Sequence, residues 1–130
     1  MKLNLGSGMF YKPGYVNIDD NPEQAVADEW KDILRLDYEN DSVDEIEASH
    51  ILEHFDINYT PYILANLFRM LKPNGSLYLE VPNLRKAVKS LRFKSWQSKL
   101  NAIKFLYGID LPGNFHKSGF TFHILARFLR

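Results

Sequence analysis

The chain has 130 residues, of which 45% are hydrophobic and 25% charged; this suffices for one folded core, so we expect residues 1–130 to form a single domain. Lys and Arg total 16 and Asp and Glu also total 16, so no net basic field attracts nucleic acid or an anionic membrane. No cysteine occurs, which excludes disulfides and a cysteine nucleophile and favours a cytoplasmic location, and no apolar run approaches the roughly 18 residues of a membrane span.

The first predicted strand leads directly into a glycine-containing loop. Leu3 to Leu5 is a short segment with apolar ends, and Gly6 and Gly8 follow it with only Ser7 between them. Because glycine has no Cβ, this loop can adopt left-handed φ angles and a ligand can lie against its main chain. The pattern is typical of a loop that binds a nucleotide-like ligand.

The second predicted strand, Tyr15 to Ile18, ends at Asp19. A carboxylate at this strand tip is placed to bind the hydroxyls of a ribose, and Asp19 is our candidate for that role. Only six residues, 9–14, separate Gly8 from Tyr15, whereas a crossover with a helix takes about ten to twelve residues. The helix N-terminus that would bind a pyrophosphate is therefore missing, so NAD and FAD are disfavoured and a ligand with a ribose but no phosphate is favoured.

The next elements are less regular. Residues 25–30 are consistent with a short third strand, which the segment 31–36 and a turn at 39–42 follow. Val43 to Ser49 alternates only in part between apolar and polar residues, but its place after the turn suits a central strand. His50 then lies at the C-terminal end of that strand.

The clearest predicted helix has Thr60 as its N-cap and Pro61 at its first helical position. Its apolar stripe consists of Ile63, Leu64, Leu67, Met70 and Leu71. Residues 73–75, with the sequence Pro-Asn-Gly, end the helix. Ser76 to Val81 is then predicted to be a strand.

The C-terminal part of the chain is predicted to be mainly helical, with residues 86–106 in two pieces and a further helix at 122–130. Its basic residues are interpreted as a solvated helix face, and a nucleic-acid groove is the less favoured alternative; they are Arg85, Lys86, Lys89, Arg92, Lys94 and Lys99. The alternation of strands and helices predicts an α/β fold with a Rossmann-like, mostly parallel sheet and flanking helices.

No convincing strand follows Val81, so we expect the fifth strand to lie at the edge of the sheet. An exposed edge strand offers unpaired backbone groups and needs a cover. The candidates for this cover are aromatic residues of the C-terminal part, namely Phe105, Tyr107, Phe115 and Phe120. A second copy of the chain, forming a homo-oligomer through this edge, is the alternative.

Five segments in chain order form a set that points to a family. They are LNLGSG at 3–8, VNID at 16–19, DILRLDYENDSVDEI at 32–46, SHILEH at 49–54 and LFRMLKPNGSLYLEVPN at 67–83. Each is weak alone, but each falls where an α/β fold of this kind places its ligand groups. Together they resemble the class I S-adenosylmethionine-dependent methyltransferases, which implies S-adenosylmethionine as cofactor.

The resemblance implies a cofactor role for each matching position. The glycine loop would pack against the methionine part of the cofactor through Asn4, Leu5, Gly6, Ser7 and Gly8. Asp19 would bind the ribose hydroxyls, and Asp32 would bind the adenine amino group, with Asp37 as the less favoured alternative. Ser49 and His50 would flank the cofactor at the end of the fourth strand.

Methyl transfer needs an aligned acceptor atom and, where the acceptor carries a proton, a general base. The candidates for this base are His50 and His54, with Glu53 next. Residues 50–54 also fit the H-x-x-E-H zinc pattern, but that pattern requires a helix and a third ligand, so we expect no metal. His116 and His123 are interpreted as packed or solvent-bridged residues rather than catalytic ones.

The chain departs from the family pattern in three places. Asn4 stands where an acid is often found, the helix after the glycine loop is missing, and no segment with the pattern of the family's last strands follows Val81. The helix deletion also occurs in relatives often linked to sugar or polysaccharide modification. The resemblance thus implies methyl transfer to a small polar acceptor, such as a sugar or related metabolite. The alternative is a truncated module that binds cofactor or a partner without turnover.

Overall fold

A computed structural model describes residues 1–93, 95–108 and 115–130. These residues group into two compact units. The first unit comprises Met1–Ile51 and Pro61–Glu80, and the second comprises Leu52–Thr60 and Val81–Arg130. Within the described part of the chain, every helix is too short or too polar to cross a membrane.

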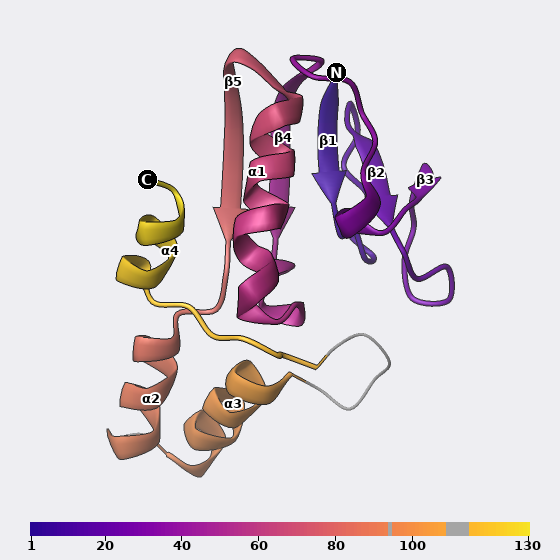
Figure 1. The fold of residues 1–130 in the computed structure, drawn as a ribbon. Coiled ribbons are helices and arrows are strands. Elements are labelled where there is room, and N and C mark those ends of the chain that lie inside the picture. Colours follow the sequence, from indigo (N-terminus) through magenta and orange to yellow (C-terminus); the bar gives the residue numbers. More distant parts are fainter. Residues whose placement is uncertain (94, 109–114) are drawn as a thin grey trace. The chain divides into compact units, whose positions relative to one another are not determined.

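The first unit contains a five-stranded sheet with the order β3-β2-β1-β4-β5 (Figure 1). The strands are β1 (Lys2–Leu5), β2 (Val16–Asp19), β3 (Glu29–Trp30), β4 (Val43–Ser49) and β5 (Leu71–Glu80). Each neighbouring pair is parallel. The predicted α/β fold with a Rossmann-like parallel sheet is therefore confirmed. Parallel strands bring their carboxyl ends to one edge, so the residues after β1, β2 and β4 lie along the same edge.

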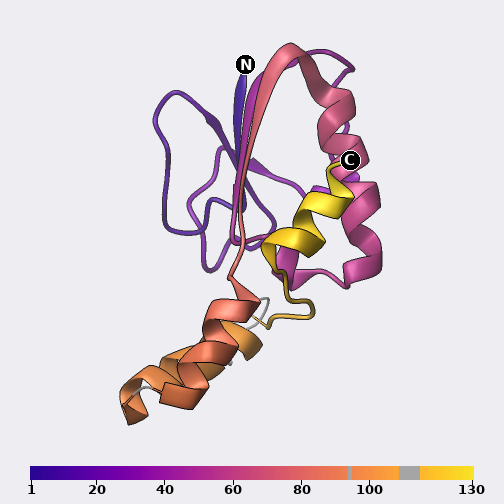
Figure 2. The same cartoon turned by 90° about the vertical axis from the view of Figure 1, so that its left-hand side faces the viewer.

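Helix α1 (Thr60–Met70) covers one face of this sheet (Figure 2). Its predicted apolar stripe is buried: Ile63, Leu64, Leu67 and Met70 are at most 2% exposed. The buried strand residues of this unit include Leu3, Leu5, Ile18, Val43 and Ile46. The apolar residues predicted for α1 and for strands β1, β2 and β4 thus form this core.

Three element boundaries differ from the sequence prediction. The third strand is only two residues long, Glu29–Trp30. Strand β5 begins at Leu71, which was assigned to the helix stripe but pairs with Val43. The register between β4 and β5 then shifts, so residues 73–75 lie within the irregular start of the strand rather than in a separate turn.

The predicted N-cap is also wrong. Thr60 already has helical backbone angles, with φ −51° and ψ −47°, and its buried hydroxyl has no hydrogen-bond partner among the described residues. A short 3₁₀ turn at Ile57–Tyr59 precedes the helix, and Asp56 caps that turn by accepting a hydrogen bond from the Asn58 N–H at 2.9 Å. Asp56, four residues before Thr60, is therefore the capping residue, because the backbone is already helical at Thr60.

The connection from β1 to β2 contains no helix, as expected, and a buried asparagine holds it in place. Asn17 is 0% exposed. Its Oδ1 accepts hydrogen bonds from the Lys12 N–H and from Asn4 Nδ2, both at 2.8 Å. Its Nδ2 carries two hydrogens, which are shared among three acceptors at hydrogen-bond distance: the Lys12 carbonyl, the Tyr15 carbonyl and Asp28 Oδ2. One fully satisfied amide therefore fixes the loop that replaces the crossover helix.

One face of strand β4 carries glutamates that contact side chains of β1 and of the loop between β1 and β2. Glu45 and Glu47 lie two residues apart, on the same face of the strand. Glu45 binds Lys2 at 2.7 Å and also the Tyr15 hydroxyl. Glu47 binds Lys12, whose ammonium lies 4.1 Å from the centre of the Tyr15 ring. Central strands of parallel sheets are usually apolar on both faces because helices cover them; here loop side chains contact this face instead, which explains the partial alternation of residues 43–49.

The hydrogen bonds of Asp28 are expected to make the stability of the fold depend on pH in the acidic range. Its carboxylate accepts hydrogen bonds from the N–H and the side-chain amide of Asn17 and from the Tyr11 hydroxyl, and these bonds hold its pKa below the usual 3.8. A lowered carboxyl pKa stabilises the fold above the unfolded pKa, and this stability is lost as the pH falls through the lowered value. We therefore expect Asp28→Asn to be less stable at neutral pH and to lose less stability on acidification, measured by urea unfolding between pH 7 and pH 3.

Asp20→Asn is the matched control for this prediction, because Asp20 is exposed in the same segment. The control should keep the acid dependence of the wild-type protein. A parallel loss of stability with pH in Asp28→Asn and the wild type would contradict the assigned role of Asp28.

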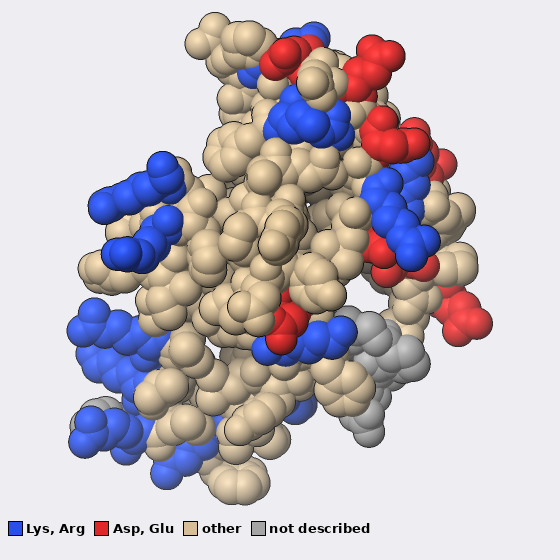
Figure 3. Space-filling view, in the orientation of Figure 1, with Lys and Arg blue, Asp and Glu red and all other residues tan. Residues whose placement is uncertain are grey.

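The second unit contains α2 (Leu84–Phe93), α3 (Trp96–Tyr107) and α4 (Phe122–Phe128), as well as the 3₁₀ turn Leu52–His54. The prediction of two helical pieces followed by a further helix is confirmed. The basic residues of α2, namely Arg85, Lys86, Lys89 and Arg92, are exposed and gather over this helix in Figure 3. This exposure agrees with a solvated helix face; Lys94 lies outside the described residues.

The aromatic residues named as a cover for the fifth strand differ in exposure, and the cover itself stays a prediction. Strand β5 does lie at one edge of the sheet. However, Phe105, Tyr107 and Phe115 are 52%, 70% and 51% exposed. Phe120 is fully buried and forms a bridge to Asn83 in its own unit. Self-association through the β5 edge stays a prediction.

Candidate cofactor and catalytic sites

The glycine loop adopts the conformation that its sequence predicts. Gly6 and Gly8 have φ angles of +61° and +50°, in the left-handed region that favours glycine. Ser7 between them is buried, and its hydroxyl donates to the Val26 carbonyl at 2.9 Å. Backbone hydrogen bonds from Ser7 to the Ile18 carbonyl and from Val26 to the Gly8 carbonyl fix the loop further. The loop is thus held from several sides before any ligand arrives.

The two glycines are required for different reasons. A Cβ built on Gly6 would lie 2.7 Å from Cγ1 and 2.9 Å from Cδ1 of Ile51, which is closer than real contacts allow. A Cβ built on Gly8 would meet nothing within 4 Å. Gly6 therefore allows close packing against Ile51, two residues after the end of β4. The space beside Gly8 is open, as a loop that receives a ligand requires.

Asp19 lies at the end of β2, beside this loop. Its Oδ2 accepts a hydrogen bond from the Gly8 N–H at 2.9 Å, and its Oδ1 accepts one from the Asn21 N–H at 3.0 Å. A carboxylate has about four lone-pair sites, so both oxygens can still accept hydrogen bonds from a diol. The structure thus brings Asp19 and the glycine loop together, as expected from their positions at two strand ends.

Two of the loop positions named from the sequence face the interior. Leu5 is 1% exposed and Asn4 is 7% exposed. The Asn4 amide donates to Asn17 Oδ1 and to the Phe10 carbonyl, so it holds the loop rather than replacing an acid at a ligand site. Leu5 can reach a ligand only through its main chain. The roles of Asn17 and Asp28 could not be predicted from the sequence, because no local pattern shows that Asn17 is buried or that Asp28 accepts its hydrogen bonds.

The two candidate adenine ligands have structural partners. Asp32 caps a 3₁₀ turn at Ile33–Arg35, accepting a hydrogen bond from the Leu34 N–H at 2.9 Å. Asp37 pairs with Lys31 at 3.1 Å, and this ammonium lowers the pKa of the Asp37 carboxyl. The Asp37 side chain is 80% exposed. Neither arrangement selects an adenine ligand, and Asp32 remains the prediction.

The end of β4 carries a strained residue. His50 has φ +56°, the left-handed region, although it is not glycine. Its N–H donates to the Glu80 carbonyl at 2.8 Å, and its Nε2 lies 3.9 Å from Glu80 Oε1. Ser49 Oγ donates to Glu80 Oε2 at 3.0 Å. Glu80, at the end of β5, was not predicted; only the pairing of β4 with β5 places it beside Ser49 and His50.

We expect the strain at His50 to appear in stability measurements. A left-handed backbone costs a non-glycine residue roughly 1–2 kcal/mol, so His50→Gly should unfold with a free energy about 1 kcal/mol higher than His50→Ala in urea. Both variants lose the imidazole, so the comparison isolates the backbone. If the two variants are equally stable, the backbone at position 50 is not strained.

Glu53, His54 and His116 form a cluster in the second unit. Glu53 is 1% exposed. One candidate ligand atom from each of the three residues lies within 4.8 Å of the other two, and the two imidazole rings meet edge to face at 5.1 Å between centroids. Glu53 and His54 are candidate bases from the sequence, whereas His116 is interpreted there as a packed or solvent-bridged residue. Their distance along the chain, more than 60 residues, hides this contact from any local pattern.

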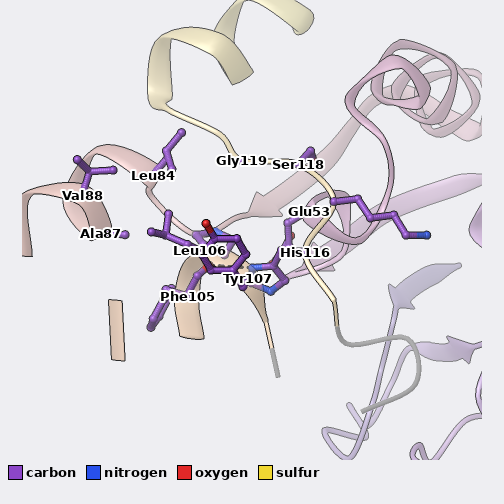
Figure 4. Close-up of a pocket in the computed structure, with 12 residues that line it drawn as sticks. Glu53, Leu84, Ala87, Val88, Phe105, Leu106, Tyr107, His116, Ser118 and Gly119 are labelled. Atoms are coloured by element: carbon purple, nitrogen blue, oxygen red, sulfur yellow. Dashed lines mark hydrogen bonds between the residues drawn. The ribbon is translucent and has the colours of Figure 1, made fainter. Parts of the chain in front are cut away.

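Part of this cluster lines a pocket of about 400 Å³ in the second unit (Figure 4). Glu53 and His116 form its polar wall together with Lys117 and Ser118. The remaining lining is mostly apolar: Pro82, Leu84, Ala87, Val88, Phe105, Leu106, Tyr107 and Gly119. Such a pocket suits a ligand with an apolar body and a few polar groups.

This chain resembles known proteins in both sequence and structure. Residues 9–123 match the family model described as a methyltransferase domain. The crystal structure of a SAM-dependent methyltransferase from Archaeoglobus fulgidus is similar over 98% of this chain, with a TM-score of 0.66 and 19% sequence identity. This chain covers 57% of that protein, so it spans little more than half of its length. The likeness confirms the fold. No curated protein matches the chain.

Proposed function

Because this chain belongs to the methyltransferase-domain family, we propose that it transfers a methyl group from S-adenosylmethionine to a small polar acceptor, such as a sugar or related metabolite. When bound, this cofactor supplies a sulfonium methyl group that an electron-rich acceptor atom can attack. The observation that carries the proposal is the pairing of Asp19 with the Gly8 N–H. In this pairing, the carboxylate that we propose to bind the ribose lies beside the glycine loop.

The loop residues fit such a cofactor better than they fit a dinucleotide. The space beside Gly8 is open, and the connection from β1 to β2 is a loop fixed by Asn17 rather than a helix. No helix N-terminus follows Gly8, so the usual donor for a pyrophosphate is missing there. Main-chain groups of residues 4–8 would bind the methionine part, Asp19 would bind the ribose, and Ser49 and His50 would flank the cofactor.

The acceptor must lose a proton if a hydroxyl or ammonium group is methylated. His50 and His54, with Glu53 next, are the side chains that we propose for this task. The strained backbone of His50 supports its place in the site, because strain of this kind collects at functional positions. Asp32 is proposed to bind the adenine amino group.

The test is calorimetry of the full 130-residue chain with S-adenosylhomocysteine, and NAD as the competing ligand. We expect micromolar binding of S-adenosylhomocysteine and binding of NAD that is at least tenfold weaker. Equal or tighter binding of NAD would contradict the argument from the missing helix. Absence of any S-adenosylhomocysteine binding to the folded chain would overturn the proposal.

A module without turnover is the second candidate, because the chain spans 57% of the solved structure that it resembles. The two candidates differ in the transfer of labelled methyl groups from S-adenosylmethionine into a pool of small metabolites. Labelling that His50→Ala abolishes would support the enzyme. Cofactor binding without any labelling would support the module.

A further inference from the structure

We propose that Glu53, His54 and His116 bind a divalent transition-metal ion, best matched by zinc, on the wall of the pocket in the second unit. In the sequence, the H-x-x-E-H pattern at residues 50–54 lacks a helix and a third ligand, and no metal is expected from it alone. The structure supplies the third ligand from another segment: His116 joins Glu53 and His54, with candidate ligand atoms within 4.8 Å of one another. The inference does not depend on methyl transfer.

The hydrogen bonds of the two histidines determine which ring nitrogen can bind a metal. His54 Nδ1 lies 3.1 Å from the Phe115 carbonyl oxygen, and His116 Nδ1 lies 2.8 Å from the Phe105 carbonyl oxygen. A carbonyl oxygen can only accept, so Nδ1 carries the proton in both rings. In the neutral imidazoles the lone pair is then on Nε2. Metal-binding histidines are usually oriented in this way, by a hydrogen bond from the other nitrogen to a carbonyl or carboxylate.

The third donor is a carboxylate in a buried position. Glu53 is 1% exposed, and a bound cation would stabilise the charge of a buried carboxylate. Two imidazole lone pairs beside a carboxylate form a set of acceptors that a cation can satisfy. The set of two nitrogens and one oxygen suits zinc or a similar first-row ion, whereas magnesium prefers oxygen ligands alone.

Backbone hydrogen bonds hold the two segments of the site together. The Glu53 carbonyl accepts the N–H groups of Lys117 at 2.7 Å and Ser118 at 3.1 Å, and Ser118 Oγ donates to the Leu52 carbonyl at 3.2 Å. Ligands on one zinc, each about 2.0–2.2 Å from it, are roughly 3.5 Å apart in a tetrahedral site. Side-chain movements of about 1 Å would therefore close the cluster around an ion.

Three protein ligands leave a fourth position open. Glu53 and His116 line the pocket, and Figure 4 shows their side chains next to each other at its polar end. A water or a ligand oxygen can enter the fourth position from this pocket, as in zinc sites that remain accessible. With an ion bound, Glu53 and His54 would serve as ligands, which leaves His50 as the base among the proposed residues.

The experiment uses the tag-free full chain, stripped of metal and titrated with Zn²⁺ by calorimetry and with Co²⁺ by visible absorption, without cofactor. We expect one ion per chain and the absorption of a low-coordinate cobalt site. His116→Ala should bind at least tenfold more weakly. His123→Ala is the matched control, because His123 is exposed on α4 and outside the cluster, and it should bind as the wild type does.

His54→Gln provides a second variant in case His116→Ala does not fold, and circular dichroism checks both. No binding of Zn²⁺ or Co²⁺ to the folded wild-type chain would overturn the proposal. Undiminished binding in both variants would also overturn it. Binding of S-adenosylhomocysteine is measured separately, so failure of the metal site leaves the proposed function to its own test.

Discussion

Asp19→Ala is expected to weaken binding of S-adenosylhomocysteine by roughly 30- to 1,000-fold. The carboxylate of Asp19 would accept hydrogen bonds from the two ribose hydroxyls, and bonds to a charged group contribute about 1.5–3 kcal/mol each, with a sum below simple addition. A loss of about 2–4 kcal/mol corresponds to that range of affinity. The measurement is calorimetry on the wild-type and variant chains under identical conditions.

Asp19 also orders the loop, so two further variants separate ligand contact from loop structure. Asp19→Asn keeps an oxygen that can accept the Gly8 N–H, which the wild-type carboxylate does at 2.9 Å, but it lacks the charge. Its affinity should fall between those of the wild type and Asp19→Ala. Asp20→Ala, at the exposed neighbouring position, should bind normally. An Asp19→Ala chain that melts like the wild type and binds with full affinity would exclude the ribose role.

Gly6→Ala is expected to destabilise the fold by about 2–5 kcal/mol. The φ angle of +61° costs an alanine roughly 1–2 kcal/mol. The added Cβ also lies 2.7 Å from Cγ1 of Ile51, and overpacking of this kind in a core costs about 1–3 kcal/mol. Urea unfolding measures the change, and cofactor affinity should fall with it, because the displaced loop carries Gly8.

Gly14→Ala is the matched control. Gly14 has a φ angle of +83°, but a Cβ there would meet nothing within 4 Å, so only the backbone cost of roughly 1–2 kcal/mol is expected. A double-mutant cycle with Ile51→Ala tests the contact itself: the pair of substitutions should cost less than the sum of the two single ones. Strict additivity of the two changes in unfolding free energy would show that the Ile51 side chain does not cause the cost of a Cβ at position 6.

Most of the parallel sheet could be predicted because its signals are local. The apolar residues of α1 recur with the period of a helix, and Gly6 and Gly8 follow an apolar segment directly. Asp19 could be named because a residue after a parallel strand must lie at the ligand-binding edge. Two predictions were wrong at the ends of elements: Thr60 is helical rather than a cap, and Leu71 is in a strand rather than in the helix. At such ends, a hydrogen bond to a neighbouring segment decides whether a residue is part of a helix or a strand.

The functional assignments depended on the sequence to different degrees. Ser49 and His50, at the end of β4, and Glu53 could be named as candidates from the sequence. The contacts of Glu80 and His116 with these residues could not be predicted, because they form only through pairing of distant segments. The role of Asn17 could not be predicted either. Its sequence context is that of an ordinary strand residue, yet it is fully buried and holds the helix-free loop.

The sequence by itself determined the order of the elements, the glycine loop, the acid at the end of β2 and the lack of a crossover helix, since each depends on neighbours within about twelve residues. Only the tertiary structure decided which polar residues are buried and that His116 lies beside Glu53 and His54. Those outcomes depend on contacts between segments far apart in the chain, whose partners no local pattern specifies.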